Sequence, residues 1–256
     1  MVSSGAVSDA VRRDALILRA SLAMVWLLTA VSIAHPYYRE VGEAELAAIG
    51  LPAWLMWATD LAELALAAIV LRGPSSTALT ALQVGMVSSF TLILAIAHPM
   101  LIVSPFGMLS KNLQFVFVAL TAWQLERKGW DERLERFLAA GMALVWITEG
   151  LLPKILFQQA VELSIAPEAG LDFVEPWILV GVVGVAQLAS GIAVLVLPRR
   201  PRAWLLFCQL AALVALPLVV GSIRPLLWVH PFGPLIKNFP IIAGTYLVWR
   251  RCSQPS

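Results

Sequence analysis

The stretch "HPFGPLIKN" at residues 230–238 has a counterpart 126 positions earlier, "SPFGMLSKN" at residues 104–112. Both stretches contain Pro-Phe-Gly and then, after three residues, Lys-Asn, directly before an apolar run. Proline removes a backbone donor and glycine frees the backbone, so each stretch predicts a turn that leads into a helix. A turn repeated in this detail indicates that the chain contains two copies of one unit.

Two further pairs of segments support the duplication. "LAMVWLLT" (22–29) matches "MALVWITE" (142–149) at an offset of 120, and "DLAELALAAIVLRGP" (60–74) matches "GVAQLASGIAVLVLP" (184–198) at an offset of 124. The rising offset places insertions in the loops of the second copy. The sequence therefore predicts a first repeat over 1–128 and a second repeat over 129–256.

The composition is that of a membrane protein. Hydrophobic residues form 60% of the chain, charged residues form 13%, and the mean hydropathy is +0.83. Soluble domains are about half apolar and about a quarter charged, so this chain cannot cover a water-soluble globule with polar surface. We therefore expect contact with the lipid bilayer. The net charge of +2 without a basic stripe excludes a nucleic-acid partner, and two cysteines exclude a disulfide framework.

Eight apolar runs are long enough to span a bilayer, which takes about 20 helical residues at about 1.5 Å each. They lie at 15–34, 53–71, 77–97, 109–126, 136–152, 176–197, 203–222 and 235–250. The predicted fold class is all-α, a polytopic membrane protein with about eight transmembrane helices in two four-helix repeats. The first run resembles a signal peptide, but its repeat partner in mid-chain predicts a retained helix.

Four helices per copy make both copies enter the membrane from the same side, so the repeats are predicted to be parallel. Basic residues cluster at one side of the predicted spans, at Arg12, Arg13, Arg72, Arg127, Lys128, Arg133, Arg136, Arg199, Arg200, Arg202, Arg250 and Arg251. Acidic residues cluster at the other side, at Glu40, Glu43, Glu45, Glu162, Glu168, Asp172 and Glu175. The positive-inside rule then predicts a cell (inner) membrane protein with both termini in the cytoplasm.

Charged residues also fall inside the predicted spans. Lys111 and Lys237 lie six residues beyond the turn proline of their copies, roughly 9 Å below the outer boundary. Asp60 and Glu63 lie in the first copy, and Glu149 lies in the second. A buried ammonium needs a partner or a water-filled cavity, unless its stem reaches the headgroups. We expect Lys111 to pair with Asp60 or Glu63, and Lys237 to pair with Glu149, each within its own copy.

Such pairs could lock a helix bundle or form a functional site, and the sequence leaves both explanations open. His35, His98 and His230 fall on the predicted outer side, but no ligand spacing supports a metal or haem site. Trp228, beside His230 in the outer loop, is the tryptophan that we expect to contact a ligand.

Three segments of the second copy resemble the DoxX-like family of small four-helix membrane proteins: "VWITEGLLPKIL" (145–156), "GVAQLASG" (184–191) and "HPFGPLIKN" (230–238). The matching family positions are Trp146, Gly150, Leu151, Pro153, Lys154, Pro231, Phe232, Pro234 and Asn238. The second copy has Gln187 where the family tends to have Glu. The first copy keeps that acid as Glu63, but it lacks the Gly-Leu-x-Pro-Lys element on its opening helix.

The resemblance implies an integral membrane subunit of a redox system that binds a quinone, or another small lipid-soluble substrate, near the outer face. It also implies a partner oxidoreductase. The lysines and asparagines would donate to carbonyl oxygens while a glutamate exchanges protons. The predicted catalytic residues are Glu63, Glu149, Lys111 and Lys237, and the predicted ligand-binding residues are Asp60, Asn112, Lys154, Gln187, Trp228, His230 and Asn238.

Two other functions remain open from the sequence. The same buried charges could form the pathway of a transporter or channel for protons or a small solute. The protein could also be a structural membrane anchor for a partner enzyme. No set of redox-active residues is visible, which argues against a self-sufficient oxidoreductase.

Overall fold

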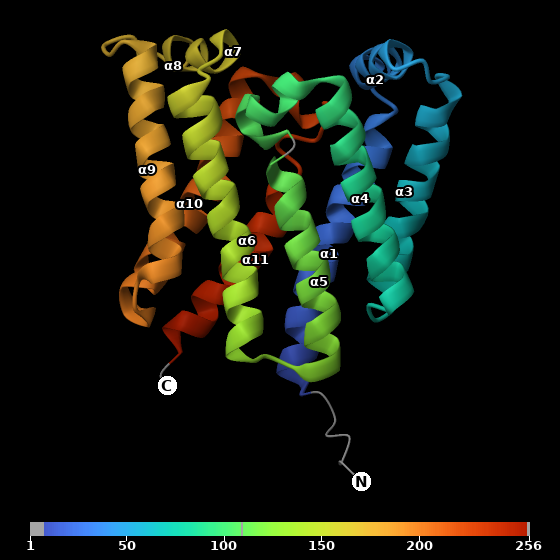
Figure 1. The fold of residues 1–256 in the computed structure, drawn as a ribbon, viewed down its shortest axis with the longest axis vertical. Coiled ribbons are helices and arrows are strands. Elements are labelled where there is room, and N and C mark those ends of the chain that lie inside the picture. Colours follow the sequence, from blue (N-terminus) through green and yellow to red (C-terminus); the bar gives the residue numbers. More distant parts are fainter. Residues whose placement is uncertain (1–7, 109, 255–256) are drawn as a thin grey trace.

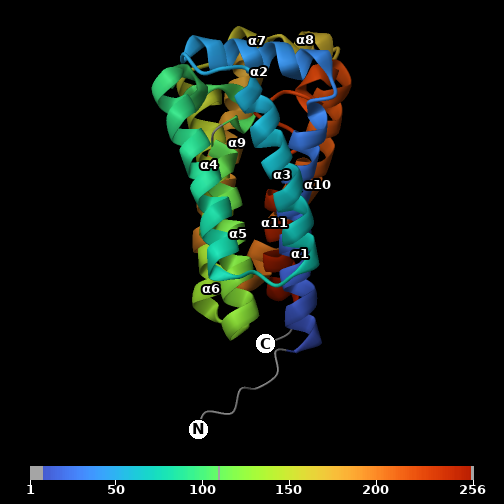
Figure 2. The same ribbon diagram turned by 90° about the vertical axis from the view of Figure 1, so that its right-hand side faces the viewer.

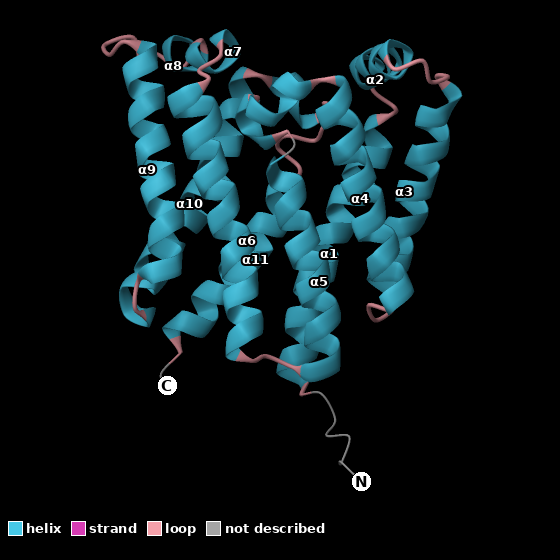
Figure 3. Ribbon diagram, viewed as in Figure 1, coloured by secondary structure: helices cyan, strands magenta, loops and turns pink. Residues whose placement is uncertain are grey.

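The computed structural model describes residues 8–108 and 110–254, and that part of the chain is helical with connecting loops and no strand (Figures 1 and 3). Its long helices are α1 (Asp9–Ser32), α3 (Trp54–Arg72), α4 (Thr77–Ala97), α5 (Ser110–Lys128), α6 (Glu132–Leu151), α9 (Pro176–Val196), α10 (Arg199–Ile223) and α11 (Asn238–Ser253). The prediction of an all-α membrane protein is confirmed.

Six of these helices are long and apolar enough to cross a membrane: α1, α3, α4, α6, α9 and α10. The remaining two, α5 and α11, carry buried polar residues such as Gln114 and Thr245. Both helices pack against other helices of the bundle, so they need less apolar surface than a helix that faces lipid. The count of eight spans stays a prediction.

The central helices are α1, α5, α6 and α11, which pack against one another (Figure 1). The first copy adds α3 and α4 on one flank, and the second copy adds α9 and α10 on the other. Fully buried Leu18, Val118, Leu138 and Leu247 fill the contact between the central helices. The two copies therefore share one core.

Both copies run in the same direction. Figure 1 shows α1 and α6 rising from the end that holds both chain termini. Each is followed at the opposite end by short helices, which are α2 (Pro36–Ala48) in the first copy and α7 (Ala160–Leu163) and α8 (Ile165–Glu168) in the second. The repeat is therefore parallel, as predicted. The short helices were not predicted, because they lie across the end of the bundle and are too short or too polar to register as spans (Figure 2).

Equivalent contacts hold these short helices to the bundle. His98 at the end of α4 contacts Glu45 of α2, with Nε2 and Oε2 2.7 Å apart. Arg224, at the same repeat position after α10, contacts Glu168 of α8. His98 and Arg224 therefore have the same role, because each holds a short helix to the bundle in its own copy.

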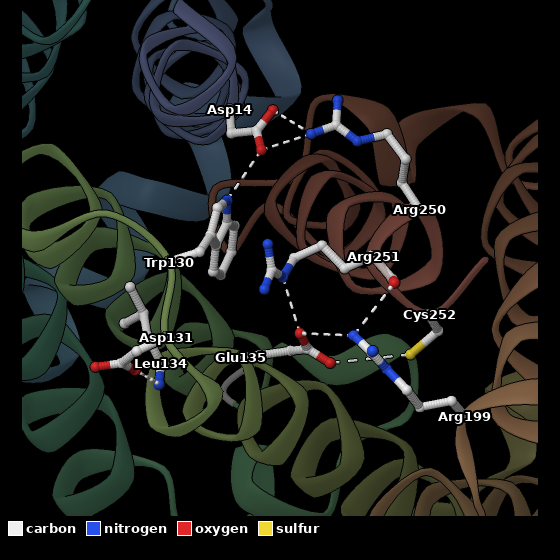
Figure 4. Close-up of polar contacts among 9 residues, drawn as sticks. All are labelled: Asp14, Trp130, Asp131, Leu134, Glu135, Arg199, Arg250, Arg251 and Cys252. Atoms are coloured by element: carbon white, nitrogen blue, oxygen red, sulfur yellow. Dashed lines mark hydrogen bonds and ion pairs between the residues drawn. The ribbon is translucent and has the colours of Figure 1, made fainter. Parts of the chain in front are cut away.

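Two arginines at the end of α11 hold this helix to its neighbours, and one of them, Arg250, joins the two copies (Figure 4). Arg250 Nη2 lies 2.5 Å from both carboxylate oxygens of Asp14, which also accepts a hydrogen bond of 2.9 Å from Trp130 Nε1. Arg251 Nε donates to Glu135 Oε2 at 2.8 Å. These contacts tie α11 to α1 and α6, so this end of the bundle is fixed.

The predicted turns are present before α5 and α11. Phe106 and Gly107 have φ angles of 67° and 69°, and Gly233 has a φ of 56°. Side chains rarely adopt this left-handed region, and glycine adopts it freely. A Cβ added to Gly107 would also lie 2.7 Å from side-chain carbons of Lys111. Each glycine therefore lets the chain reverse and place the lysine that follows.

We predict that Gly107→Val and Gly233→Val each lower the unfolding free energy by about 1–3 kcal/mol, because valine is strained in this backbone region. Thermal unfolding in mild detergent measures the effect. Gly85→Val is the matched control, since a Cβ at Gly85 in α4 meets nothing within 4 Å. Equal melting temperatures for all three variants would show that the turns accept a valine side chain at these glycine positions.

The parallel repeat also predicts where two chain positions lie relative to the membrane. In a background without Cys208 and Cys252, Ser253→Cys and Asp172→Cys introduce exposed labels at opposite ends of the molecule. A membrane-impermeant maleimide on intact cells should label Asp172→Cys alone. Labelling of both positions would contradict the predicted topology.

Candidate functional site

Two cavities lie at repeat-related places, one in each half of the molecule. The first cavity has a volume of about 240 Å³ and lies between α3 and α4, with α2 forming part of its wall. The second cavity has a volume of about 280 Å³ and lies between α9 and α10, beside α8. The two flanking helices of each pair contact each other sparsely, which leaves space for a cavity between them.

Polar residues of the first cavity come from several elements. Asp60 and Glu63 lie on α3, Tyr38 lies on α2, and Asn112 lies at the start of α5. Lys237, just before α11, also lines this cavity, as does the Glu45–His98 pair. Tyr38 Oη donates a hydrogen bond of 2.8 Å to Asp60 Oδ1, which fixes that carboxylate.

Aromatic and amide side chains hold the inner wall of the first cavity in place. Trp26 packs edge-on against Phe115, with ring centroids 5.0 Å apart, and its Nε1 donates to Gln83 Oε1 at 3.1 Å. Asn112 Nδ2 donates to Thr91 Oγ1 at 2.8 Å. This wall is therefore preorganised and mostly apolar.

The second cavity contains a buried ion pair between a lysine and a glutamate. Lys154 Nζ lies 2.5 Å from Glu162 Oε1, and both side chains are buried. Lys154 lies in a π-helical segment, η3 (Leu152–Leu156), that packs against Gly184. A Cβ at Gly184 would lie 2.7 Å from Lys154 Cβ. Gly184 stands where the first copy has Asp60, so loss of that side chain makes room for the lysine.

The remaining polar residues of the second cavity are less fully paired. Glu149 of α6 accepts a hydrogen bond from Ser110 Oγ. Trp146 Nε1 is buried and has no hydrogen-bond partner among the described residues, and the same holds for Gln187 Oε1. Asn238 at the start of α11 also lines this cavity.

The lysines cross between the copies. Lys237 of the second copy lines the first cavity, and Lys111 of the first copy lines the second cavity. Lys111 Nζ donates to the Pro234 carbonyl oxygen at 2.6 Å, and Lys237 Nζ donates to the Met108 carbonyl oxygen at 3.1 Å. Each lysine is therefore held by the turn of the other copy. Its amine donates to the protein backbone and does not reach the headgroup layer.

The phenylalanines of the turns cross in the same way. Phe232 of the second copy lines the first cavity, and Phe106 of the first copy lines the second. The two turns thus exchange an aromatic ring as well as an amine, and each cavity is built from both copies.

The predicted pairing of the charges within each copy is wrong. Lys111 lines the same cavity as Glu149 of the second copy, and Lys237 lines the same cavity as Asp60 and Glu63 of the first copy. The physical reason is that α5 packs against both α6 and α11, so its outer end lies between the copies. Successive residues of a helix point about 100° apart. Asn112 therefore faces the cavity of its own copy while Lys111 reaches the other.

A family model for the DoxX-like family matches the chain twice, over residues 23–120 and 143–246. The chain belongs to the DoxX-like family. The two matches agree with a tandem duplication, as the internal repeat predicted. No curated protein and no solved structure matches the chain.

This DoxX-like structure brings most of the predicted site residues together. The first cavity contains Asp60, Glu63, Asn112 and Lys237, and the second contains Lys111, Glu149, Lys154, Gln187 and Asn238. Trp228 and His230 line neither cavity. Trp228 packs against the backbone of Gly221 at the end of α10.

His230 is part of the outer loop structure. Its Nδ1 accepts a hydrogen bond of 3.2 Å from the Phe232 amide, and its ring packs against Tyr37 and Phe232. Burial, and then the nearby Lys237 charge, lowers the pKa of His230 to about 4. The imidazole is therefore neutral at pH 7, as its role as a hydrogen-bond acceptor requires.

Two tryptophans, a tyrosine and a glutamate are among the cavity residues that were missing from the predicted site. Trp26 and Trp146 stand at matching positions of the repeat, which was the available signal for them. Tyr38 and Glu162 lie on the short helices at the end of the bundle. Because those helices were not predicted, no sequence signal placed these two side chains over the cavities.

Proposed function

We propose that this DoxX-like protein is the membrane subunit of a redox system and binds a quinone, or a related lipid-soluble carbonyl compound, in the second cavity. The observation that carries this proposal is that Lys111 of one copy and Glu149 of the other meet at a largely apolar cavity. Its volume of about 280 Å³ is close to the lower end of the usual range for ligand pockets, about 300–1,000 Å³.

Hydrogen-bond donors in this cavity suit a carbonyl oxygen. Trp146 Nε1 has no partner among the described residues, and Lys111 and Asn238 line the same cavity. A buried donor without a partner costs about 1–3 kcal/mol, which a ligand carbonyl would recover. The surrounding Val183, Leu213 and other apolar side chains would pack against a quinone ring.

Glu149 would exchange the protons that accompany quinone reduction. Its carboxyl group is buried, accepts a hydrogen bond from Ser110, and lies in the field of the Lys111 ammonium. A carboxyl group within reach of a bound carbonyl can donate or accept a proton there. Electrons would come from a partner oxidoreductase, for which this protein would supply the quinone site.

A transport function fits the structure less well. A conducted proton or solute would need a polar route from the cavities to the end that holds the termini. Between α1, α5, α6 and α11 this half of the bundle is packed with Leu18, Leu125, Leu138 and Leu247, all fully buried. A purely structural anchor would account for the lysines as contacts between the copies, but it would not account for Trp146 Nε1, which lies beside an apolar cavity without a partner among the described residues.

We predict that the purified protein binds a short-chain ubiquinone analogue and that Lys111→Met weakens binding about tenfold to a hundredfold. Loss of a charged hydrogen bond costs about 1.5–3 kcal/mol. Titration followed by tryptophan fluorescence measures the dissociation constant. The matched control is Lys128→Met, an exposed lysine at the far end of α5, which should leave the dissociation constant unchanged.

Equal affinity in the two lysine variants would contradict the proposed role of Lys111. Absence of quinone binding by the unaltered protein, together with absence of quinone from the lipids that co-purify with it, would favour the anchor or transport functions instead.

A further inference from the structure

The first cavity differs from the second in its charge. In the second cavity two lysines balance two glutamates, namely Lys111 and Lys154 against Glu149 and Glu162. The first cavity contains three carboxylates, Glu45, Asp60 and Glu63, and one lysine, Lys237. Glu45 contacts His98, which leaves Asp60 and Glu63 with a single ammonium between them.

Glu63 is the least satisfied of these groups. The residue is 5% exposed, and its Oε2 has no hydrogen-bond partner among the residues that the structure describes. Asp60 is equally buried, and while Tyr38 occupies its Oδ1, its Oδ2 has no partner among the described residues. Lys237 acts on Glu63 at a distance, but its hydrogen bond goes to the Met108 carbonyl. The carboxylates therefore lack donors.

An ammonium group would supply what these carboxylates lack. Buried carboxylates without partners are costly, and an ammonium offers a positive charge with three N–H donors. Asp60 and Glu63 are three residues apart on α3 and so share one helical face, within reach of a single head group. Trp26, Phe90 and Phe115 line the same cavity, and aromatic rings attract cations and pack against apolar bodies.

We propose that the first cavity binds a protonated lipophilic amine, with its ammonium at Glu63 and Asp60 and its apolar body between α3 and α4. The second copy has Gln187 and Gly184 at the two matching positions, so its cavity does not provide this site. The same alkylammonium chemistry is offered by a free amine and by an aminophospholipid headgroup. This proposal concerns a different cavity from the quinone proposal and does not rest on it.

Calorimetric titration of the full-length protein in phosphatidylcholine nanodiscs tests the proposal. The probes are 2-phenylethylamine and the neutral isostere 2-phenylethanol, with empty nanodiscs as the blank. We expect the amine to bind at least about tenfold more tightly than the alcohol, because only the amine brings a positive charge and three N–H donors to the carboxylates. Equal affinities in the unaltered protein would overturn the proposal, and this comparison requires no variant to fold.

Substitutions then locate the site. Glu63→Gln and Asp60→Asn should each remove most of the preference for the amine. Glu132→Gln is the matched control, because Glu132 is exposed and pairs with Arg136 at the other end of the molecule. A preference that survives in both Glu63→Gln and Asp60→Asn would also overturn the proposal.

A second lipid composition identifies the source of the ammonium. When phosphatidylethanolamine replaces part of the phosphatidylcholine, an aminophospholipid ligand would compete with the probe and raise its apparent dissociation constant. A constant unchanged by the lipid would identify a free amine as the ligand. Failure of quinone to bind the second cavity would not affect the preference for the amine or its dependence on lipid composition.

Discussion

Each lysine of the repeated motif donates a hydrogen bond to a backbone carbonyl in the turn of the other copy, and the arrangement of the whole outer half depends on this exchange. The left-handed glycines allow the turns, and the turns present the Pro234 and Met108 carbonyl oxygens at the contact between α5 and α11. An ammonium buried at this depth needs such acceptors. Because each cavity takes one lysine from the opposite copy, neither copy alone forms a complete site.

The exchange also explains how the two copies could diverge without losing their scaffold. The acid that faces the crossing lysine lies on the second helix of the first copy, as Glu63, and on the opening helix of the second copy, as Glu149. Gly184 stands where the first copy has Asp60 and leaves room for Lys154, which pairs with Glu162. One fold thus carries a charge-balanced cavity and an acidic one, and these two environments suit ligands of opposite hydrogen-bonding character.

Much of this structure could be predicted from the sequence, because apolar run length, the doubled Pro-Phe-Gly turn and the arginine bias each report on local chemistry. The long helices, the parallel repeat, the turns and the buried carboxylates follow from those signals. The partners of Lys111 and Lys237 could not be predicted, because apolar helix sequences do not encode which helix packs against which. Aligning the two copies shows which positions are equivalent. It does not show which residues of one copy contact the other copy. The positions of Tyr38 and Glu162 could not be predicted for a different reason. The short helices that carry them have no apolar run long enough to span a membrane.

Double-mutant cycles on thermal unfolding in mild detergent test the crossing of the lysines most directly. One cycle combines Lys111→Met with Glu149→Gln, and the other combines Lys237→Met with Glu149→Gln. Residues in one charge network couple by about 0.5–3 kcal/mol, whereas independent sites add. The crossed arrangement predicts coupling between Lys111 and Glu149 and additivity between Lys237 and Glu149. Coupling confined to Lys237 and Glu149 would contradict it and would restore pairing within each copy.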